Sequence, residues 1–136
     1  MLERFEEAQK RSYSIALQEI QSGRKQSHWM WFIFPQIKGL GYSEISKYYA
    51  IQSLDEAKDY LNHPILGTRL REIAEALIDL DTNDAHAVFG NPDDLKLRSS
   101  MTLFDYIESN SVFGKVLEKF YGGNRDLRTL EIINEI

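Results

Sequence analysis

Hydrophobic residues recur at three- and four-residue steps along most of the chain, with charged residues between them, and this spacing predicts helices. The first such segment covers residues 2–21, and it is expected to end at Gly23 because glycine tolerates the left-handed conformation of a helix cap. The clearest helix follows Pro64. Its inward stripe consists of Leu66, Leu70, Ile73, Leu77 and Leu80.

Start and stop signals delimit the other elements. Ser27 can cap residues 29–34, and Pro35 ends them because the residue before a proline is pushed out of the helical region. The hydrophobic period alone fits a helix or a strand at 29–34, and we favour a helix because nothing else in the chain pairs as a sheet. Ser53 and Glu56 have the spacing of a capping box.

The remaining segments complete an all-helical pattern. No stretch of five or more residues alternates as a strand does, so the sequence predicts one all-α domain, residues 1–136, of about seven or eight short helices. The further segments predicted to be helical are 43–50, 53–61, 64–80, a short element ending at Gly90, 92–107, 111–120 and 126 to the terminus.

Composition narrows the class of protein. Hydrophobic residues make up 43% of the chain, which is enough for a core without disulfides, and the absence of cysteine excludes thiolate nucleophiles and cysteine zinc sites. A net charge of −5 argues against binding to duplex nucleic acid, which needs a basic face. The longest apolar run, 29–34, is too short to span a membrane, so we expect a cytoplasmic protein.

One segment, residues 24–43, holds both tryptophans together with cations, a histidine and glycines. This mixture is typical of a ligand cleft, in which indole rings stack on a ring and cations hold an anion. The alternative is a central core helix followed by an ordinary turn, since aromatic stripes at helical spacing are mostly core. The candidate ligand-binding residues from this segment and its expected neighbours are Arg24, Lys25, Trp29, Trp31, Gln36, Gly39, Gly41, Tyr49 and Arg69.

A second candidate segment could form the opposite wall of the cleft. Lys96 and Ser100 lie on one face of the predicted helix at i and i+4, and Ser99 and Thr102 flank them. The alternative is that the hydroxyl groups bond back to helix carbonyls where two helices cross. A Ser–Lys nucleophile is disfavoured because the Ser-x-x-Lys spacing of penicillin-binding enzymes is absent.

The histidines are spread over three segments, and no two of them have the i, i+4 spacing of a metal site. His28 lies among the unusual residues and is the candidate general acid or base, since histidine titrates near neutrality. His63 precedes a proline and is predicted to be a turn residue, while His86 could form a surface pair with Asp84. The residues indicate no metal and no cofactor.

Several strings resemble a known family. Residues 23–36 read Gly-Arg-Lys-Gln-Ser-His-Trp-Met-Trp-Phe-Ile-Phe-Pro-Gln, and with 39–41, 63–70 and 99–104 they resemble the domain-of-unknown-function 1810 family of bacterial proteins. The resemblance implies a mainly α-helical fold. It assigns no activity and no catalytic residues; some members carry a calpastatin-like label, but nothing in this chain supports protease inhibition. Residues 8–10, Ala-Gln-Lys, also resemble a stretch of the helical N-glycosidases that act on ADP-ribose-type compounds.

The sequence therefore predicts a helical protein with one polar–aromatic cleft for a small anionic ligand, nucleotide-like ligands included, with or without catalysis. The hypothesis requires segment 24–36 and the helix of Lys96 to be spatial neighbours. The first alternative is a protein-interaction module without a small-molecule ligand, and the lesser alternative is an N-glycosidase-like enzyme.

Overall fold

The computed structural model describes residues 1–135, and nine helices lie within them. No strand forms in this range; there is one isolated parallel bridge, between Ile37 and Ile51. The all-α prediction is confirmed. The described residues contain nine helices, where about seven or eight were predicted, and the short segment before Gly90 is one of them. The helices are α1 (Glu3–Gln21), α2 (Met30–Ile33), α3 (Glu44–Tyr49), α4 (Leu54–Asn62), α5 (Leu66–Ile78), α6 (Ala85–Phe89), α7 (Asp93–Ile107), α8 (Val112–Tyr121) and α9 (Leu127–Glu135).

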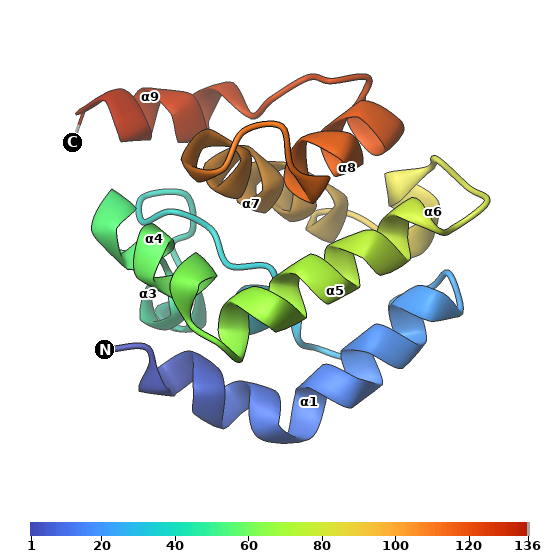
Figure 1. Ribbon diagram of the computed structural model, residues 1–136, viewed down its shortest axis with the longest axis horizontal. Coiled ribbons are helices and arrows are strands. Elements are labelled where there is room, and N and C mark those ends of the chain that lie inside the picture. Colours follow the sequence, from blue (N-terminus) through green and yellow to red (C-terminus); the bar gives the residue numbers. More distant parts are fainter. Residues whose placement is uncertain (136) are drawn as a thin grey trace.

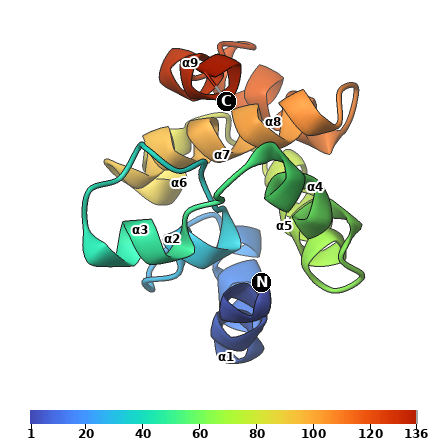
Figure 2. The same cartoon turned by 90° about the vertical axis from the view of Figure 1, so that its left-hand side faces the viewer.

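Two long helices organise the others. α5 packs between α1 and α8, and α7 packs against α4, α6, α8 and α9 (Figure 1). The two ends of the chain lie on the same side of the molecule (Figure 1). In the perpendicular view, α2 and α3 lie between α1 and α7, and the segment that carries α3 extends to one side of the bundle (Figure 2).

A chain of aromatic rings runs through the core and joins four helices. The ring centroids of Phe5 in α1 and Tyr60 in α4 lie 5.1 Å apart with edge-to-face geometry. Tyr60 contacts Phe104 of α7 at 5.5 Å, and Phe104 contacts Phe113 of α8 at 5.8 Å. Pairs at such separations are favourable beyond the apolar area that they bury.

Gln9 of α1 is a buried polar residue that connects this core to α2. Its Nε2 donates to the carbonyl oxygen of Phe32 at 2.8 Å and to the hydroxyl of Tyr60 at 3.0 Å, and its Oε1 accepts from Arg69 at 3.4 Å. The short helix α2 cannot satisfy its own last carbonyls, so a side chain from α1 supplies a donor. Gln9 thereby fixes where α2 lies on α1.

Glu19 of α1 fixes the segment that precedes α2. Its carboxylate accepts hydrogen bonds from the amides of Gln26 and Ser27, from the Ser27 hydroxyl at 2.6 Å, and from the indole Nε1 of Trp29 at 2.9 Å. The sequence predicted Ser27 as the cap of α2. This prediction is wrong, because the Ser27 hydroxyl donates to Glu19. Partial burial disfavours the charged carboxylate, but these four hydrogen bonds outweigh it and lower the pKa of Glu19 to about 2.

Residues 37–51, which we call the α3 loop, are closed at their base by the bridge between Ile37 and Ile51. The Lys38 amide donates to the Ile51 carbonyl, and the Ile51 amide donates to the Gln36 carbonyl, both at 2.8 Å. Ser43 caps α3 as predicted, since its hydroxyl accepts from the Ser46 amide at 3.2 Å. No residue of α3 is fully buried. The loop therefore protrudes from the bundle on a closed base.

Capping contacts decide the helix boundaries that the sequence pattern left approximate. α5 begins after Pro64 because Nδ1 of His63 accepts from the amides that open the helix, which confirms His63 as a turn residue. α5 ends at Ile78, two residues early, where the Lys119 ammonium donates to its last carbonyls. Ser53, predicted as part of a capping box, and Ser111, the first residue of the segment predicted at 111–120, both accept from helix amides.

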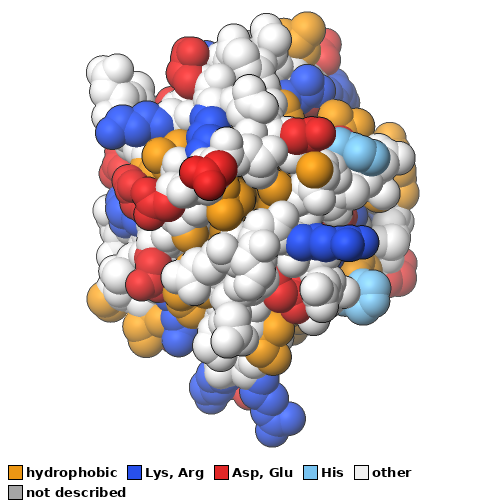
Figure 3. All heavy atoms as spheres, turned by 90° about the vertical axis from the view of Figure 1, so that its right-hand side faces the viewer, with side chains coloured by type: hydrophobic (Ala, Val, Ile, Leu, Met, Phe, Trp, Pro, Cys, Tyr) orange, Lys and Arg blue, Asp and Glu red, His pale blue; other side chains and the backbone are white. Residues whose placement is uncertain are grey.

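Charges of both signs are mixed on the surface. On the face shown in Figure 3, basic and acidic side chains are interspersed and form no continuous basic area (Figure 3). Within residues 1–135, no helix combines the length and the hydrophobicity that crossing a bilayer requires.

The Glu19 contacts predict a specific pH dependence of stability. The carboxyl has a lower pKa in the folded protein than its ordinary value of 4.5, so its stabilisation is complete above pH 4.5 and is lost as the pH falls towards 2. The unfolding free energies of wild type and Glu19→Gln can be compared by urea unfolding. Their difference should be constant near neutral pH and should become smaller as the pH falls from 4.5 towards 2.

The matched control is Glu7→Gln on the same helix, which removes only an exposed pair with Lys10 and should change stability little at any pH. A difference between wild type and Glu19→Gln that stays constant down to pH 2 would contradict the role given to Glu19.

The α3 loop predicts a steric coupling between Gly41 and Ser46. A Cβ atom at Gly41 would lie 2.4 Å from the Ser46 Cβ, well inside van der Waals contact. Gly41→Ala should therefore destabilise the protein by about 1–3 kcal/mol through overpacking. In a Ser46→Gly background the same substitution should cost much less. Equal costs in both backgrounds, measured by urea unfolding, would show that this contact does not constrain the loop.

Candidate functional site

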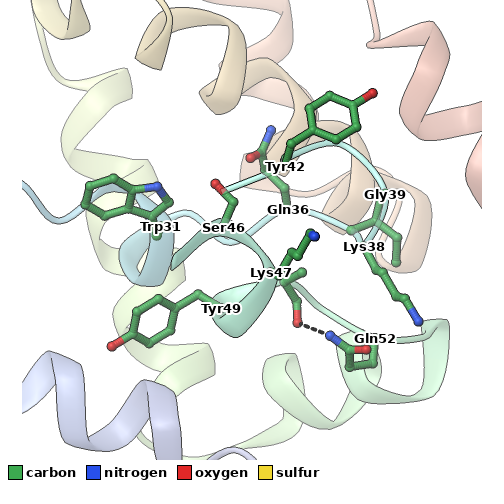
Figure 4. Close-up of a pocket in the computed structure, with 12 residues that line it drawn as sticks. Trp31, Gln36, Lys38, Gly39, Tyr42, Ser46, Lys47, Tyr49 and Gln52 are labelled. Atoms are coloured by element: carbon green, nitrogen blue, oxygen red, sulfur yellow. Dashed lines mark hydrogen bonds between the residues drawn. The ribbon is translucent and has the colours of Figure 1, made fainter. Parts of the chain in front are cut away.

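A cleft of about 350 Å³ lies between α2 and the α3 loop (Figure 4). Its hydrophobic base includes Ile37 and Ala50, whose side chains are buried. Ile37 is paired in the bridge that closes the α3 loop, and Ala50 immediately precedes its partner, Ile51. Five of the residues predicted for ligand binding line this cleft, and they are Trp31, Gln36, Gly39, Gly41 and Tyr49.

Trp31 and Tyr49 form an aromatic end of the cleft (Figure 4). Trp31 is partly exposed, whereas Tyr49 packs on the core rings of Phe32 and Phe5, with centroids 5.2 and 6.0 Å away. Burial, followed by the neighbouring hydroxyl of Tyr48, raises the pKa of Tyr49. Tyr49 therefore keeps its proton at neutral pH and can act as a hydrogen-bond donor.

Lys38 and Lys47 supply the cations of the cleft; Lys38 lies with the amide side chain of Gln52 on the side away from these rings, and Lys47 reaches in between (Figure 4). Gln52 donates to the Ala50 carbonyl at 3.0 Å. Among residues 1–135, no hydrogen bond or ion pair involves the side chains of Lys38, Lys47 or Gln36. No carboxylate lines the cleft. The cleft is thus locally positive in a chain whose net charge is −5.

The helix of Lys96 lies beside this segment, as the cleft hypothesis requires. The Lys96 ammonium is 5.4 Å from the ring centroid of Trp31 and 3.7 Å from a carboxylate oxygen of Asp93. Asp93 also pairs with Lys25 at 3.0 Å, and Lys25 donates to the Ser27 carbonyl. Lys25 is therefore occupied by protein partners, while Lys96 covers part of the Trp31 ring.

Four other predicted binding or catalytic residues lie elsewhere. Trp29 is 1% exposed, with its indole N–H bonded to Glu19, so it belongs to the core. Arg24 and His28 are exposed and do not line the cleft. Arg69 contacts Gln9 and lies 5.1 Å from the ring centroid of Tyr13, which places it between α1 and α5.

The hydroxyl groups of α7 do not line the cleft either. Ser99 donates to the Leu95 carbonyl, and Thr102 donates to the Arg98 carbonyl at 2.7 Å. Thr102 also accepts from the Asp126 amide at the start of α9. The alternative interpretation, hydroxyls bonded back to helix carbonyls, describes Ser99 and Thr102. Ser100 is fully buried, and its hydroxyl has no partner among residues 1–135.

The remaining histidines have structural surroundings. His86 lies 3.4 Å from Asp94 and not beside Asp84, because the Asp84 carboxylate caps α6 through the Ala87 amide. Among residues 1–135, no group of three or more histidine, cysteine or acidic side chains is arranged to hold a metal ion.

The two lysines of the cleft and the polar side chains near them were not among the residues predicted for the site. Lys38 immediately precedes Gly39, a residue that was predicted, so its position beside a site was available as a signal. Lys47 and Gln52 reach the cleft only because the bridge of Ile37 with Ile51 folds the chain back on itself. An isolated bridge has no periodic sequence pattern from which to predict it.

Comparisons with known proteins agree with the resemblance. The crystal structure of the conserved hypothetical protein Rv1873 from Mycobacterium tuberculosis is similar, with 45% sequence identity, a TM-score of 0.95, and coverage of 98% of this chain and 96% of that one. No protein with a curated description matches. The family pattern described as "Protein of unknown function (DUF1810)" matches residues 1–133, and the chain therefore belongs to the DUF1810 family.

Proposed function

We propose that the protein binds a small anionic ligand in the cleft between α2 and the α3 loop. The observation that carries this proposal is the pair Lys38 and Lys47, two cations that have no partner among residues 1–135 and that line a cleft without carboxylates. A cleft lined by one sign of charge concentrates its field and attracts ions of the opposite sign. In a chain with a net charge of −5, this part of the surface therefore differs in charge from the molecule as a whole.

The other lining groups suit the same kind of ligand. The side-chain amide of Gln36 supplies donors and an acceptor, and the partly exposed ring of Trp31 supplies an apolar face. A cleft volume of about 350 Å³ lies within the range of small-molecule sites. Gly41 has no side chain, which leaves room beside Ser46 for the loop backbone to line the cleft.

The lining favours binding over catalysis. A nucleophile needs an adjacent base, and the cleft is lined by neither a histidine nor a carboxylate. Its one serine, Ser46, bonds to the hydroxyl of Ser43 at 2.8 Å. Gln9, from the Ala-Gln-Lys stretch that resembles the N-glycosidases, is buried and bonded to Phe32 and Tyr60. We further propose that the protein works in the bacterial cytosol, where a chain without cysteine needs no oxidising compartment.

The alternative function, a protein-interaction module, is favoured by exposed apolar side chains on the α3 loop. Tyr42 is 85% exposed, Tyr48 is 60% exposed and Ile45 is 40% exposed. Aromatic residues of this kind are enriched at protein interfaces. Under this alternative the loop would be covered by a partner and the lysines would form its polar rim.

An NMR titration with inorganic phosphate, pyrophosphate and the four common nucleoside 5′-monophosphates tests the proposed function. At least one of these anions should shift the amide signals of residues 36–52. Lys38→Gln combined with Lys47→Gln should weaken that binding by about tenfold per lysine, since a hydrogen bond to a charged group contributes about 1.5–3 kcal/mol.

The matched control is the pair Lys58→Gln and Lys115→Gln, two exposed lysines outside the cleft, which changes the net charge by the same amount. It should leave the affinity nearly unchanged. If none of the six anions shifts residues 36–52 at millimolar concentration, the anion site is refuted and the interaction module is favoured.

A further inference from the structure

Rings and cations are unevenly distributed along the cleft. Trp31 and Tyr49 lie towards one side, and Lys38 and Gln52 lie towards the other, where the exposed ring of Tyr42 also lies, with Lys47 reaching in between (Figure 4). A ligand that matched only the lysines would leave the indole face in contact with water, and one that matched only the rings would leave two ammonium groups without a partner. The lining therefore selects a molecule with two unlike ends.

The two lysines of the cleft favour a ligand group with two negative charges. They come from different segments, Lys38 from the base of the α3 loop and Lys47 from α3. A carboxylate carries one negative charge, whereas a phosphate monoester carries about −1.5 to −2 at neutral pH together with three acceptor oxygens. A phosphate monoester therefore matches two ammonium groups in charge and in the number of hydrogen bonds that they can donate.

The ring of Trp31 has one face that is already used. The Lys96 ammonium lies 5.4 Å from its centroid and is held there by Asp93. A ligand ring that stacks on Trp31 must therefore use the opposite face. Trp31 itself lies in the short helix α2, whose position Gln9 and Glu19 fix from α1. The backbone that carries the ring is thus fixed from α1.

The size of the cleft suits a ligand of about the size of a mononucleotide. A volume of about 350 Å³ lies near the lower end of the range of roughly 300–1,000 Å³ for small-molecule sites. One heterocycle, one sugar and one phosphate are compatible with this space.

We infer that the ligand is a nucleoside 5′-monophosphate, with its base stacked on Trp31 and its phosphate between Lys38 and Lys47. This inference rests on the proposed function, because it names the ligand class of the same cleft. It adds that affinity has two separable parts, one from the ring and one from the phosphate, and that Trp31 is the residue on which the ring part depends.

Calorimetry with matched ligands separates these parts. The probes are the four nucleoside 5′-monophosphates, the corresponding nucleosides, and ribose 5-phosphate, which has the sugar and phosphate without the base. The best nucleotide should bind about tenfold more tightly than ribose 5-phosphate, as stacking of one base on an aromatic side chain predicts. Trp31→Leu should abolish this advantage and leave ribose 5-phosphate binding unchanged, while Trp31→Phe should retain part of it.

Tryptophan fluorescence gives a second measurement on the same proteins. The best nucleotide should quench the emission of wild type, and Trp31→Leu, which retains only the buried Trp29, should show no quenching. Far-ultraviolet circular dichroism of each variant verifies that it is folded, and Trp31→Phe provides a ring-bearing substitute should Trp31→Leu fail to fold.

The outcomes distinguish the two proposals. If ribose 5-phosphate binds as tightly as every nucleotide, or if Trp31→Leu keeps the full advantage of the base, the ligand class is wrong and the anion site stands. If nucleotides bind but shift no amide among residues 36–52, the inference is also overturned. If neither nucleotides, ribose 5-phosphate nor inorganic phosphate binds, the proposed function itself fails.

Discussion

The structure depends on hydrogen bonds from side chains of α1 to the backbone of one irregular segment. Residues 24–29 and the end of α2 run beside the core without forming enough regular helix to satisfy their own amides and carbonyls. A buried backbone group without a partner is costly. Glu19 accepts from the amides of Gln26 and Ser27, and Gln9 donates to the carbonyl of Phe32. Helix α1 therefore determines where the aromatic segment lies, and with it one wall of the cleft.

The two tryptophans have different surroundings although they are close in the sequence. Trp29 and Trp31 are separated by a single residue, yet the first is completely buried and the second faces the cleft. Trp29 makes an indole hydrogen bond to the same carboxylate that holds the backbone before it. Each ring also has a lysine over it, Lys25 over Trp29 and Lys96 over Trp31. The buried Trp29 thus helps to fix the backbone that carries Trp31 at the wall of the cleft.

The opposite wall is built on a different principle. The α3 loop has no fully buried helical residue, and its closure depends on two backbone hydrogen bonds at the Ile37–Ile51 bridge. Among residues 1–135, the side chains of Lys38 and Lys47 have no protein partner, whereas Lys25 pairs with Asp93, Arg4 with Glu56 and Arg125 with Asp105.

The sequence by itself determined the fold class, most helix boundaries and the segment that carries the aromatic wall. These features are local, because hydrophobic period, serine caps and glycines act within a few residues of the chain. It also identified Trp31, Gln36, Gly39, Gly41 and Tyr49 as residues that line one cleft. Only the tertiary structure decided that Trp29 belongs to the core, that Lys25 is neutralised by Asp93, and that Lys38 and Lys47 supply the cations of the cleft. These assignments depend on contacts between segments far apart in the chain, and a residue's type does not specify which distant partner it will meet.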